Sequence, residues 1–423
     1  MKCINCRNLQ LKKIVNVGSQ PLSGIFYKSK QKKLKKFPLN LYFCKRCRLV
    51  QLLKTAKKNL MFGKFYEYRT SLSNLMVNHL EKKKKYLKDK KYINSSSSVL
   101  DIGSNDGTFL NSLNCSTLCG ADPTAYKFKG YYKKGIYIIN NFFSKKNIEN
   151  FLQKEISEKI QFDLITSFAM FYDIDEPNYF CRDIYKLLKK NGVWVLELSY
   201  FPLMLKNLTY DQICHEHIAY YTLTVFKKII ERHNLRIIEV SLNEINGGSI
   251  EIMCAKKNSK FKINKKKISK ILVDEMKIKD KSYKNFNKRI NRVKTLLQMF
   301  LNLNSKKKIV GYGASTKGNV VLNHCKIKNT QIKEICDGSV KKISKYTPGS
   351  NIQIISKEEM RRKKPDYLLV LIWPFRKEVI KQELNFLKNG GKLVFHLPRF
   401  HIVNINNFKS YLKEDFKNLS YDY

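Results

Sequence analysis

The run VLDIGSNDGTFL, residues 99–110, constrains the fold more than any other stretch of this sequence. An apolar strand ends at Asp101, and Gly103 and Gly107 precede a helical pattern. Because glycine has no Cβ, the backbone there can turn sharply and pass close to a ligand at the start of the helix. A strand, a glycine loop and a helix in this order predict an α/β fold.

The same alternation continues along the chain. From residue 99 to about 254, short apolar runs alternate with helical patterns, which predicts a parallel sheet with crossover helices. Residues 255–307 are rich in lysine and helical in pattern, with one apolar stripe that we expect to serve packing. A second α/β unit follows, with the candidate strands KIVGYGAS, IKEICDG, DYLLVLIWPF and KLVFHLP.

The glycine spacing indicates the kind of ligand. The loop reads G-x-x-x-G with Asn105 inside it, whereas a dinucleotide needs the tighter G-x-G-x-x-G turn for its pyrophosphate. An acid-containing loop of this kind suits a ligand with no phosphate and a cationic amino acid end, and S-adenosylmethionine (SAM) is such a ligand. Asp122 follows the next candidate strand, where an acid can bind both ribose hydroxyls. The alternative is a tight strand–helix turn in which Asp122 only starts a helix. We predict a SAM site made of Asp101, Gly103, Asn105, Gly107 and Asp122.

Two C-x-x-C pairs near the N-terminus predict a metal site. Cys3, Cys6, Cys44 and Cys47 place two thiols on each of two tight turns. Four thiolates suit tetrahedral zinc and leave no open position, so we expect structural zinc. The long interval between the pairs predicts an inserted hairpin or loop. The alternative is four unrelated reduced cysteines.

The composition excludes several classes of protein. A hydrophobic fraction of 43%, with 24 tyrosines and 25 phenylalanines, is not that of a disordered chain. No apolar run approaches the ~20 residues of a spanning helix, and the start MKCINC offers no apolar signal-peptide region. We therefore expect a cytoplasmic protein without membrane association. The net charge of +48 could indicate nucleic-acid binding, but the lysines are dispersed and we interpret them as compositional drift.

The stretch YDQICHEHIAYYT, residues 210–222, places Glu216 between His215 and His217. Histidines two apart do not fit the metalloprotease pattern, which needs them four apart on a helix. Ordinary packing is the alternative for either histidine alone. The density of acid, imidazole and tyrosine groups favours proton transfer, because an imidazole with a pKa near ~6.5 can act as a base at neutral pH.

The ordered set of motifs resembles a known family. DIGSNDG with GADPTA looks like a class I methyltransferase. The cysteine pairs, FYEYRTSLS, FAMFYDIDEP, ICHEHIAYY and GYGASTKGN add a resemblance to the three-domain sugar C-methyltransferases of nucleotide-linked deoxysugar pathways. This resemblance implies a zinc-binding domain at 1–65, a Rossmann-like SAM-dependent methyltransferase domain at 66–260, and a Rossmann-like α/β domain with a helical linker at 261–423. It implies a nucleotide-linked 4-keto sugar as substrate and methylation at carbon 3.

The resemblance also assigns roles in the H-E-H segment. His217 corresponds to the base that removes the proton beside the ketone, and Glu216 to the acid that helps to organise the site. Many relatives carry tyrosine before H-E-H, whereas this chain has Cys214, and a thiol is a weak donor. We assign Cys214 and His215 to the substrate side of the site.

Other groups must then orient the substrate and hold the enolate oxygen. The family places the aromatics corresponding to Tyr66 and Tyr68 against the cofactor and the sugar. Anchoring of a linker is the alternative for both. Tyr172 and Asp173 follow a candidate strand at the edge where strand ends line a ligand crevice, and we favour a role in the site for both. In the last unit, the resemblance directs Lys317 and Asn319 toward the nucleotide sugar.

Two alternative functions remain open at this point. One is an O- or N-methyltransferase, which would not need to remove a proton beside a carbonyl. The other is a basic, zinc-containing nucleic-acid-binding protein. The sequence leaves the oligomeric state open.

Overall fold

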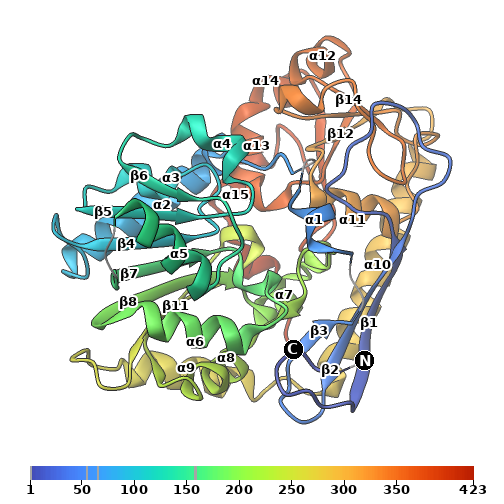
Figure 1. Ribbon diagram of the computed structural model, residues 1–423. Coiled ribbons are helices and arrows are strands. Elements are labelled where there is room, and N and C mark those ends of the chain that lie inside the picture. The colour runs from blue at the N-terminus through green and yellow to red at the C-terminus, as the bar shows by residue number, and fades with distance from the viewer. Residues whose placement is uncertain (1, 54–55, 64–65, 157–159) are drawn as a thin grey trace.

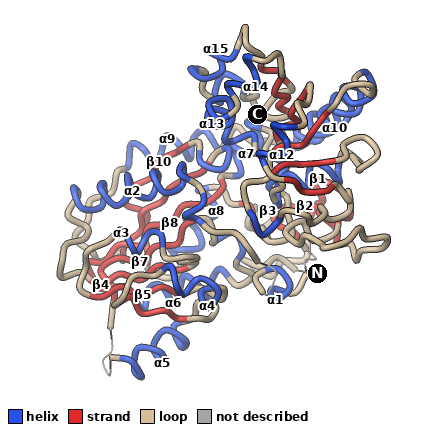
Figure 2. The backbone as a smooth tube through the Cα atoms, turned by 90° about the horizontal axis from the view of Figure 1, so that it is seen from above, coloured by secondary structure: helices blue, strands red, loops and turns tan. Residues whose placement is uncertain are grey.

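The computed structural model describes residues 2–53, 56–63, 66–156 and 160–423, and these form three sheets of four, seven and six strands. The seven-stranded sheet lies on one side of the molecule, and the four- and six-stranded sheets lie on the other (Figure 1). A second view from above gives the same division (Figure 2). The prediction of an α/β fold is confirmed.

The N-terminal sheet is antiparallel, in the order β1-β2-β3-β9. Its strands are β1 (Leu11–Gln20), β2 (Phe37–Cys44), β3 (Val50–Leu52) and β9 (Ala219–Tyr220). The last strand belongs to the H-E-H segment, and the backbone N–H of Leu52 donates to the carbonyl of Ile218 at 2.8 Å. The N-terminal sheet therefore holds the H-E-H segment in place.

The central sheet has the order β10-β11-β8-β7-β4-β5-β6. Its strands are β4 (Ser98–Ile102), β5 (Thr117–Ala121), β6 (Ile136–Ile139), β7 (Phe162–Phe168), β8 (Leu188–Ser199), β10 (Leu235–Asn243) and β11 (Ser249–Lys256). β4 to β8 are mutually parallel, as predicted, but β11 runs antiparallel to both of its neighbours. The reason is that only residues 244–248 join β10 to β11, which is too short for a crossover.

Two layers of helices cover the central sheet, because alternate strand residues face opposite sides. Val99 and Leu164 pack with α2 and α3, whereas Leu100 and Ile165 pack with the helices of the other layer. The helices of this unit are α2 (Asn74–Asp89), α3 (Thr108–Ser112), α4 (Ala125–Phe128), α5 (Lys145–Glu155), α6 (Pro177–Leu187), α7 (Phe201–Asn207), α8 (Leu223–Glu231) and α9 (Lys265–Glu275). Short α1 (Lys58–Met61) precedes them.

The C-terminal sheet has the order β14-β13-β12-β15-β16-β17 and is parallel except for β17. Its strands are β12 (Ile309–Tyr312), β13 (Glu334–Cys336), β14 (Gln353–Ile355), β15 (Tyr367–Val370), β16 (Lys392–Phe395) and β17 (His401–Val403). Its helices are α11 (Thr316–His324), α12 (Lys357–Arg362), α13 (Arg376–Gln382), α14 (Leu384–Lys388) and α15 (Phe408–Lys413).

The long helix α10 (Asp280–Leu303) connects the units. The expected apolar stripe along it is buried, for example at Phe286, Val293 and Leu297. One hydrophobic cluster contains this stripe together with Val15 of the N-terminal sheet and Val310 of the C-terminal sheet. The first and last parts of the chain therefore share a core. No helix in the described parts of the chain combines the length and the apolar character of a membrane span.

Candidate active site

The four predicted metal ligands come together at one point. The sulfur atoms of Cys3 and Cys47 lie 3.5 Å apart, those of Cys6 and Cys44 lie 3.6 Å apart, and all four fall within 4.8 Å of one another. The two turns are alike, because the residue after the second cysteine of each pair has a positive φ, 60° at Arg7 and 67° at Arg48. A closed set of four thiols suits tetrahedral zinc, so the residues fit the metal.

The zinc turns contact the central unit. The side-chain amide of Asn178, on α6, donates to the carbonyl of Asn5 at 2.9 Å, and Arg7 pairs with Glu176 through hydrogen bonds of 2.6 and 2.5 Å. Glu176 precedes α6 and lines the cavity described next. The metal site thus supports one wall of that cavity.

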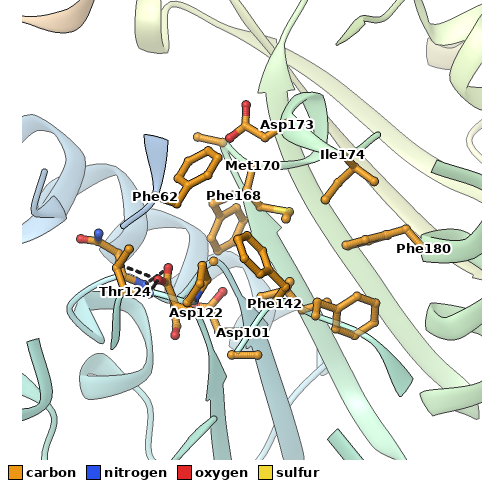
Figure 3. A pocket seen from close by; sticks show the side chains of 18 of the residues that line it. Phe62, Asp101, Asp122, Thr124, Phe142, Phe168, Met170, Asp173, Ile174 and Phe180 are labelled. Carbon is orange, nitrogen blue, oxygen red and sulfur yellow. Dashed lines mark hydrogen bonds between the residues drawn. The ribbon is translucent and has the colours of Figure 1, made fainter. Parts of the chain in front are cut away.

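A cavity of about 290 Å³ opens at the carboxyl ends of β4, β5 and β7. Figure 3 shows its acids and its apolar walls, labelled Phe62, Asp101, Asp122, Thr124, Phe142, Phe168, Met170, Asp173, Ile174 and Phe180. A slot with Asp101 and Asp122 at one end and rings along its sides suits a ligand that has a ribose, a flat base and a cationic amino acid end. The predicted cofactor residues Asp101, Gly103, Asn105, Asp122 and Tyr68 line it.

Gly107 is the predicted cofactor residue that does not line this cavity in the described structure. It has φ 73° and forms the turn into α3, where an added Cβ would lie 2.7 Å from the ring of Tyr132. The Tyr132 hydroxyl in turn donates to the carbonyl of Asn105 at 2.9 Å and lies 2.8 Å from Ser104 Oγ. Gly107 therefore acts on the loop through packing.

The two strand-end acids hold the loop as well as facing the cavity. Asp101 accepts a hydrogen bond of 2.6 Å from Thr166, and burial raises its pKa to about 7. Asp122 accepts from the backbone N–H of Asn105 at 3.0 Å and from Thr124 at 2.6 Å. Burial raises the pKa of Asp122 against the effect of these donors. Asp122 thus accepts hydrogen bonds in the turn after β5 and also lines the cavity. It can therefore have both roles considered from the sequence, as a turn residue and as a ribose-binding acid.

The segment 66–71 bridges the cofactor loop and the C-terminal unit. The Asn105 side chain donates to the carbonyl of Tyr68 at 3.0 Å and accepts from the N–H of Thr70 at 2.9 Å. At the other side, Lys345 pairs with Glu67 at 3.1 Å. Tyr66 and Tyr68 each line two cavities, the one above and a second one.

The second cavity, of about 420 Å³, opens at the carboxyl ends of β12 and β13. Its walls include polar and cationic groups of the C-terminal unit, namely Ser315, Thr316, Asp337, Lys342 and Lys357. Glu216 of the H-E-H segment lines it as well. A position for Cβ at Gly24 would lie 3.2 Å from Glu216 Oε1, so glycine there leaves room for this carboxylate.

Two dipeptides, Tyr172-Asp173 and Glu216-His217, lie next to one another beside these cavities. The ring centroids of Tyr172 and His217 are 4.1 Å apart, and the N–H of Ile218 donates to the carbonyl of Tyr172 at 2.9 Å. Asp173 lines the first cavity and Glu216 lines the second, whereas the rings of His217 and Tyr172, both described, line neither. The two rings therefore pack between a carboxyl group of each cavity.

Burial controls the protonation of these groups. Burial, with a smaller effect of the Lys317 charge, lowers the pKa of His217 to about 3. Burial also raises the pKa of Glu216, and it raises that of Asp173, where the charge of Glu216 adds to the effect. His217 is therefore neutral at pH 7, as a base must be.

The four residues predicted to contact substrate lie behind the cavity walls, and none of them, all described, lines either cavity. His215 is fully buried with its ring 5.9 Å from that of Phe37, and Cys214 is buried beside it. Asn319 is fully buried, and its amide donates to the carbonyl of Ser23 at 2.7 Å. Lys317 donates to the side chain of Asn246 at 3.1 Å.

Asp173, which the sequence indicated together with Tyr172, lines the cofactor cavity. Another acid near the site, Asp211, was missing from the predicted set. Asp211 is buried and accepts a hydrogen bond of 2.9 Å from Trp373 of the C-terminal unit. Burial raises the pKa of Asp211 to about 6, and Lys317 opposes this shift. No local pattern indicated Asp211, because its partner is 162 residues away.

Comparison with known proteins agrees with this arrangement. Three family models match, described as "Putative zinc binding domain" over residues 3–62, "Methyltransferase domain" over 75–240 and "C-methyltransferase C-terminal domain" over 244–398. The chain is 27% identical over 412 residues to the C-methyltransferase NovU of Streptomyces niveus. The aligned region covers 95% of this chain and 97% of NovU.

Solved structures match part of the chain. A SAM-dependent methyltransferase from Clostridium acetobutylicum is 14% identical with a TM-score of 0.32, and the match covers 43% of this chain and 92% of that one. Magnesium protoporphyrin IX methyltransferase from Synechocystis is 11% identical with a TM-score of 0.32, and the match covers 47% of this chain and 92% of that one. The three family models, the relative along most of the chain, the cysteine site and the acid-lined cavity together show a SAM-dependent C-methyltransferase with an N-terminal zinc-binding domain.

Proposed function

We propose that this C-methyltransferase acts on a nucleotide-linked 4-keto sugar and methylates carbon 3. The observation that carries the proposal is the meeting of two cavities at one segment. Tyr66 and Tyr68 line both the cavity with the SAM-type loop and the cavity of the C-terminal unit. A cofactor in one and a second large ligand in the other would have their reacting ends at these tyrosines.

The second cavity has the chemistry of a nucleotide site. It lies at the carboxyl ends of parallel strands, beside the start of α11, whose backbone N–H groups favour an anion. Lys342 and Lys357 line it and would add positive charge toward a diphosphate. Asp337 directly follows β13, where an acid can bind ribose hydroxyls. These groups support a nucleotide-linked ligand over a small free sugar.

Carbon methylation requires a carbanion equivalent at the acceptor. SAM supplies an electrophilic methyl group on a sulfonium, and a carbon beside a ketone becomes nucleophilic when its proton is removed. We assign proton removal to His217, with Glu216 as the adjacent acid of the second cavity. Neutral His217 is in the protonation state that a base needs, although its low pKa makes it a weak one. Glu216, whose carboxyl faces the cavity directly, would relay or hold the proton.

The enolate oxygen needs a hydrogen-bond donor. Cys214 is buried, so it does not replace the tyrosine of many relatives. Tyr66 is the stronger candidate, because it lines both cavities and burial raises its pKa, which keeps the hydroxyl protonated. Tyr172 would position the His217 ring through their contact.

The predicted substrate residues act indirectly in this scheme. Asn319 fixes Ser23, and the next residue, Gly24, lines the second cavity beside Glu216. Lys317 fixes Asn246 in the turn between β10 and β11. We place the domain boundaries at 1–65, 66–260 and 261–423, and we place the enzyme in the cytoplasm, where nucleotide sugars and SAM are available.

The test is incubation of the enzyme with SAM and a panel of nucleotide-linked keto sugars, followed by mass spectrometry for one added methyl group. Deuterated water with S-adenosylhomocysteine (SAH) in place of SAM should give exchange of the proton at carbon 3. Methylation of oxygen or nitrogen without such exchange would refute the carbon chemistry. Salt-sensitive binding of nucleic acid without turnover of any sugar would favour the nucleic-acid alternative.

A further inference from the structure

Asp173 differs from the other acids of the cofactor cavity. Asp175 pairs with Lys58 at 2.6 Å, Glu176 pairs with Arg7, and Asp183 accepts from the N–H of Lys145 at 2.8 Å. These three carboxylates are thus satisfied by the protein itself.

The two strand-end acids are satisfied as well. Asp101 accepts from Thr166, and Asp122 accepts from Asn105 and Thr124. Asp173 is the exception, since its buried Oδ1 has no hydrogen-bond partner among the residues that the structure describes. A buried carboxylate oxygen without a donor is costly unless a ligand or a proton satisfies it.

The position of Asp173 indicates which part of the cofactor it faces. Figure 3 shows it across Phe62 and Met170 from Asp101 and Asp122, the acids assigned to the amino acid and ribose ends. It also interacts electrostatically with Glu216, which lines the second cavity. This is the wall through which a methyl group must pass from one cavity to the other.

We propose that Asp173 is the counter-ion of the SAM sulfonium, and that it carries a proton when the cavity is empty or holds SAH. Two carboxyl groups close together in a buried site resist simultaneous ionisation. Glu216 is therefore one reason for Asp173 to hold a proton, and burial is the larger one. Lys58 acts in the opposite direction but is itself paired with Asp175.

The other groups around Asp173 do not replace this proton. Tyr66, Tyr172, Cys214 and Tyr220 interact with it electrostatically, and burial keeps all four of them in the neutral form. Lys58 of the same cavity is held by Asp175, so a bound sulfonium brings the positive charge that is free to pair with Asp173. Binding of SAM then releases one proton to solvent, whereas binding of SAH, whose sulfur is neutral, releases none.

The consequence for turnover follows from charge balance. When the methyl group moves to carbon, the sulfur keeps the electron pair of the broken bond and becomes a neutral thioether. Asp173 loses its counter-charge and takes up a proton again. Protonated Asp173 then needs no positive charge beside it. The contribution of Asp173 to ligand binding therefore depends on pH for SAM but not for SAH.

The experiment measures the affinity of the purified enzyme for SAM and for SAH by calorimetry between pH 5.5 and 7.0, where the α-amino groups of both ligands stay protonated. Asp101, whose pKa is raised to about 7, faces the part that SAM and SAH share, so its titration changes both affinities alike and the ratio of SAM to SAH affinity isolates Asp173. On the acidic side of the Asp173 titration, this ratio should rise about tenfold per pH unit, as for release of one additional proton by SAM. Repeating both titrations in buffers of different ionisation enthalpy counts the additional proton directly.

Two variants decide the assignment. Asp173→Asn should weaken SAM binding at pH 7 and remove the difference in pH dependence between SAM and SAH, while SAH affinity stays within about threefold of wild type and shows an intact cavity. Glu176→Gln, at an acid of the same cavity that pairs with Arg7, should keep the wild-type difference. If Asp173→Asn does not fold, Asp173→Ser serves in its place. Parallel pH dependence for SAM and SAH, a SAM affinity that does not change with pH, or an unchanged SAM preference in the Asp173 variant would overturn the proposal.

Discussion

Replacement of Gly107 by alanine tests how packing behind the cofactor loop controls the cavity. Gly107 has φ 73°, and a left-handed conformation costs a residue with a Cβ about 1 kcal/mol. The new Cβ would also lie 2.7 Å from Cδ1 and 2.9 Å from Cγ of the Tyr132 ring, too close for either atom to stay in place. Displacing the ring breaks the hydrogen bonds of its hydroxyl with Ser104 and Asn105, worth about 1 kcal/mol each. The free energy of unfolding should therefore fall by about 3 kcal/mol in Gly107→Ala, the sum of the backbone cost and the two lost hydrogen bonds.

Gly135 offers a matched control. Its φ is 86°, and no atom lies within 4 Å of the position of an added Cβ. Gly135→Ala should therefore cost only the backbone part, about 1 kcal/mol. Thermal unfolding should show a clearly larger fall in Tm for Gly107→Ala than for Gly135→Ala. Because the displaced loop carries Asn105, SAH affinity should fall about tenfold in Gly107→Ala and stay unchanged in Gly135→Ala. Equal effects of the two substitutions would refute the packing argument.

Three further predictions concern the metal and the base. Cys47→Ser, or treatment with a chelator, should remove zinc in metal analysis and lower Tm, because binding free energy at such a site is folding free energy; full zinc content with an unchanged Tm would speak against a four-thiolate site. His217→Asn should lower kcat at least about a thousandfold with SAH affinity within threefold of wild type, as for loss of a general base; undiminished turnover would remove His217 from that role. The pH profile should show no loss of activity from protonation of His217 between pH 8 and 5, because a pKa lowered to about 3 keeps the neutral, active form throughout this range; an acid limb near pH 6.5 that disappears in His217→Asn would contradict this.

The features that the sequence predicted well are those with a local chemical signature. Three such features each depend on residues close together in the sequence. They are the Gly103 loop after β4, Asp122 after β5 and the apolar stripe of α10. The cysteine pairs are local in the same sense, and tetrahedral zinc leaves few other ways to satisfy four thiols. The antiparallel direction of β11 could also have been inferred, since residues 244–248 are too few for a crossover.

The predictions for individual side chains of the H-E-H segment depended on facts that no local pattern contains. His215 and Cys214 share that segment with Glu216, yet Glu216 lines the second cavity and the other two are buried, with His215 against Phe37 of the N-terminal sheet. The contact between His217 and Tyr172 likewise depends on two loops that meet in space.

The sequence by itself determined the class of chemistry: a glycine loop with strand-end acids, a zinc site and two α/β units, each specified by neighbouring residues. Only the tertiary structure decided that segment 66–71 joins two cavities and that Asp173 and Glu216 lie on either side of the junction. The physical reason is that burial and charge–charge interaction depend on distance in space. Such distances are set by the packing of whole sheets and helices, and neighbouring letters in the chain do not encode them.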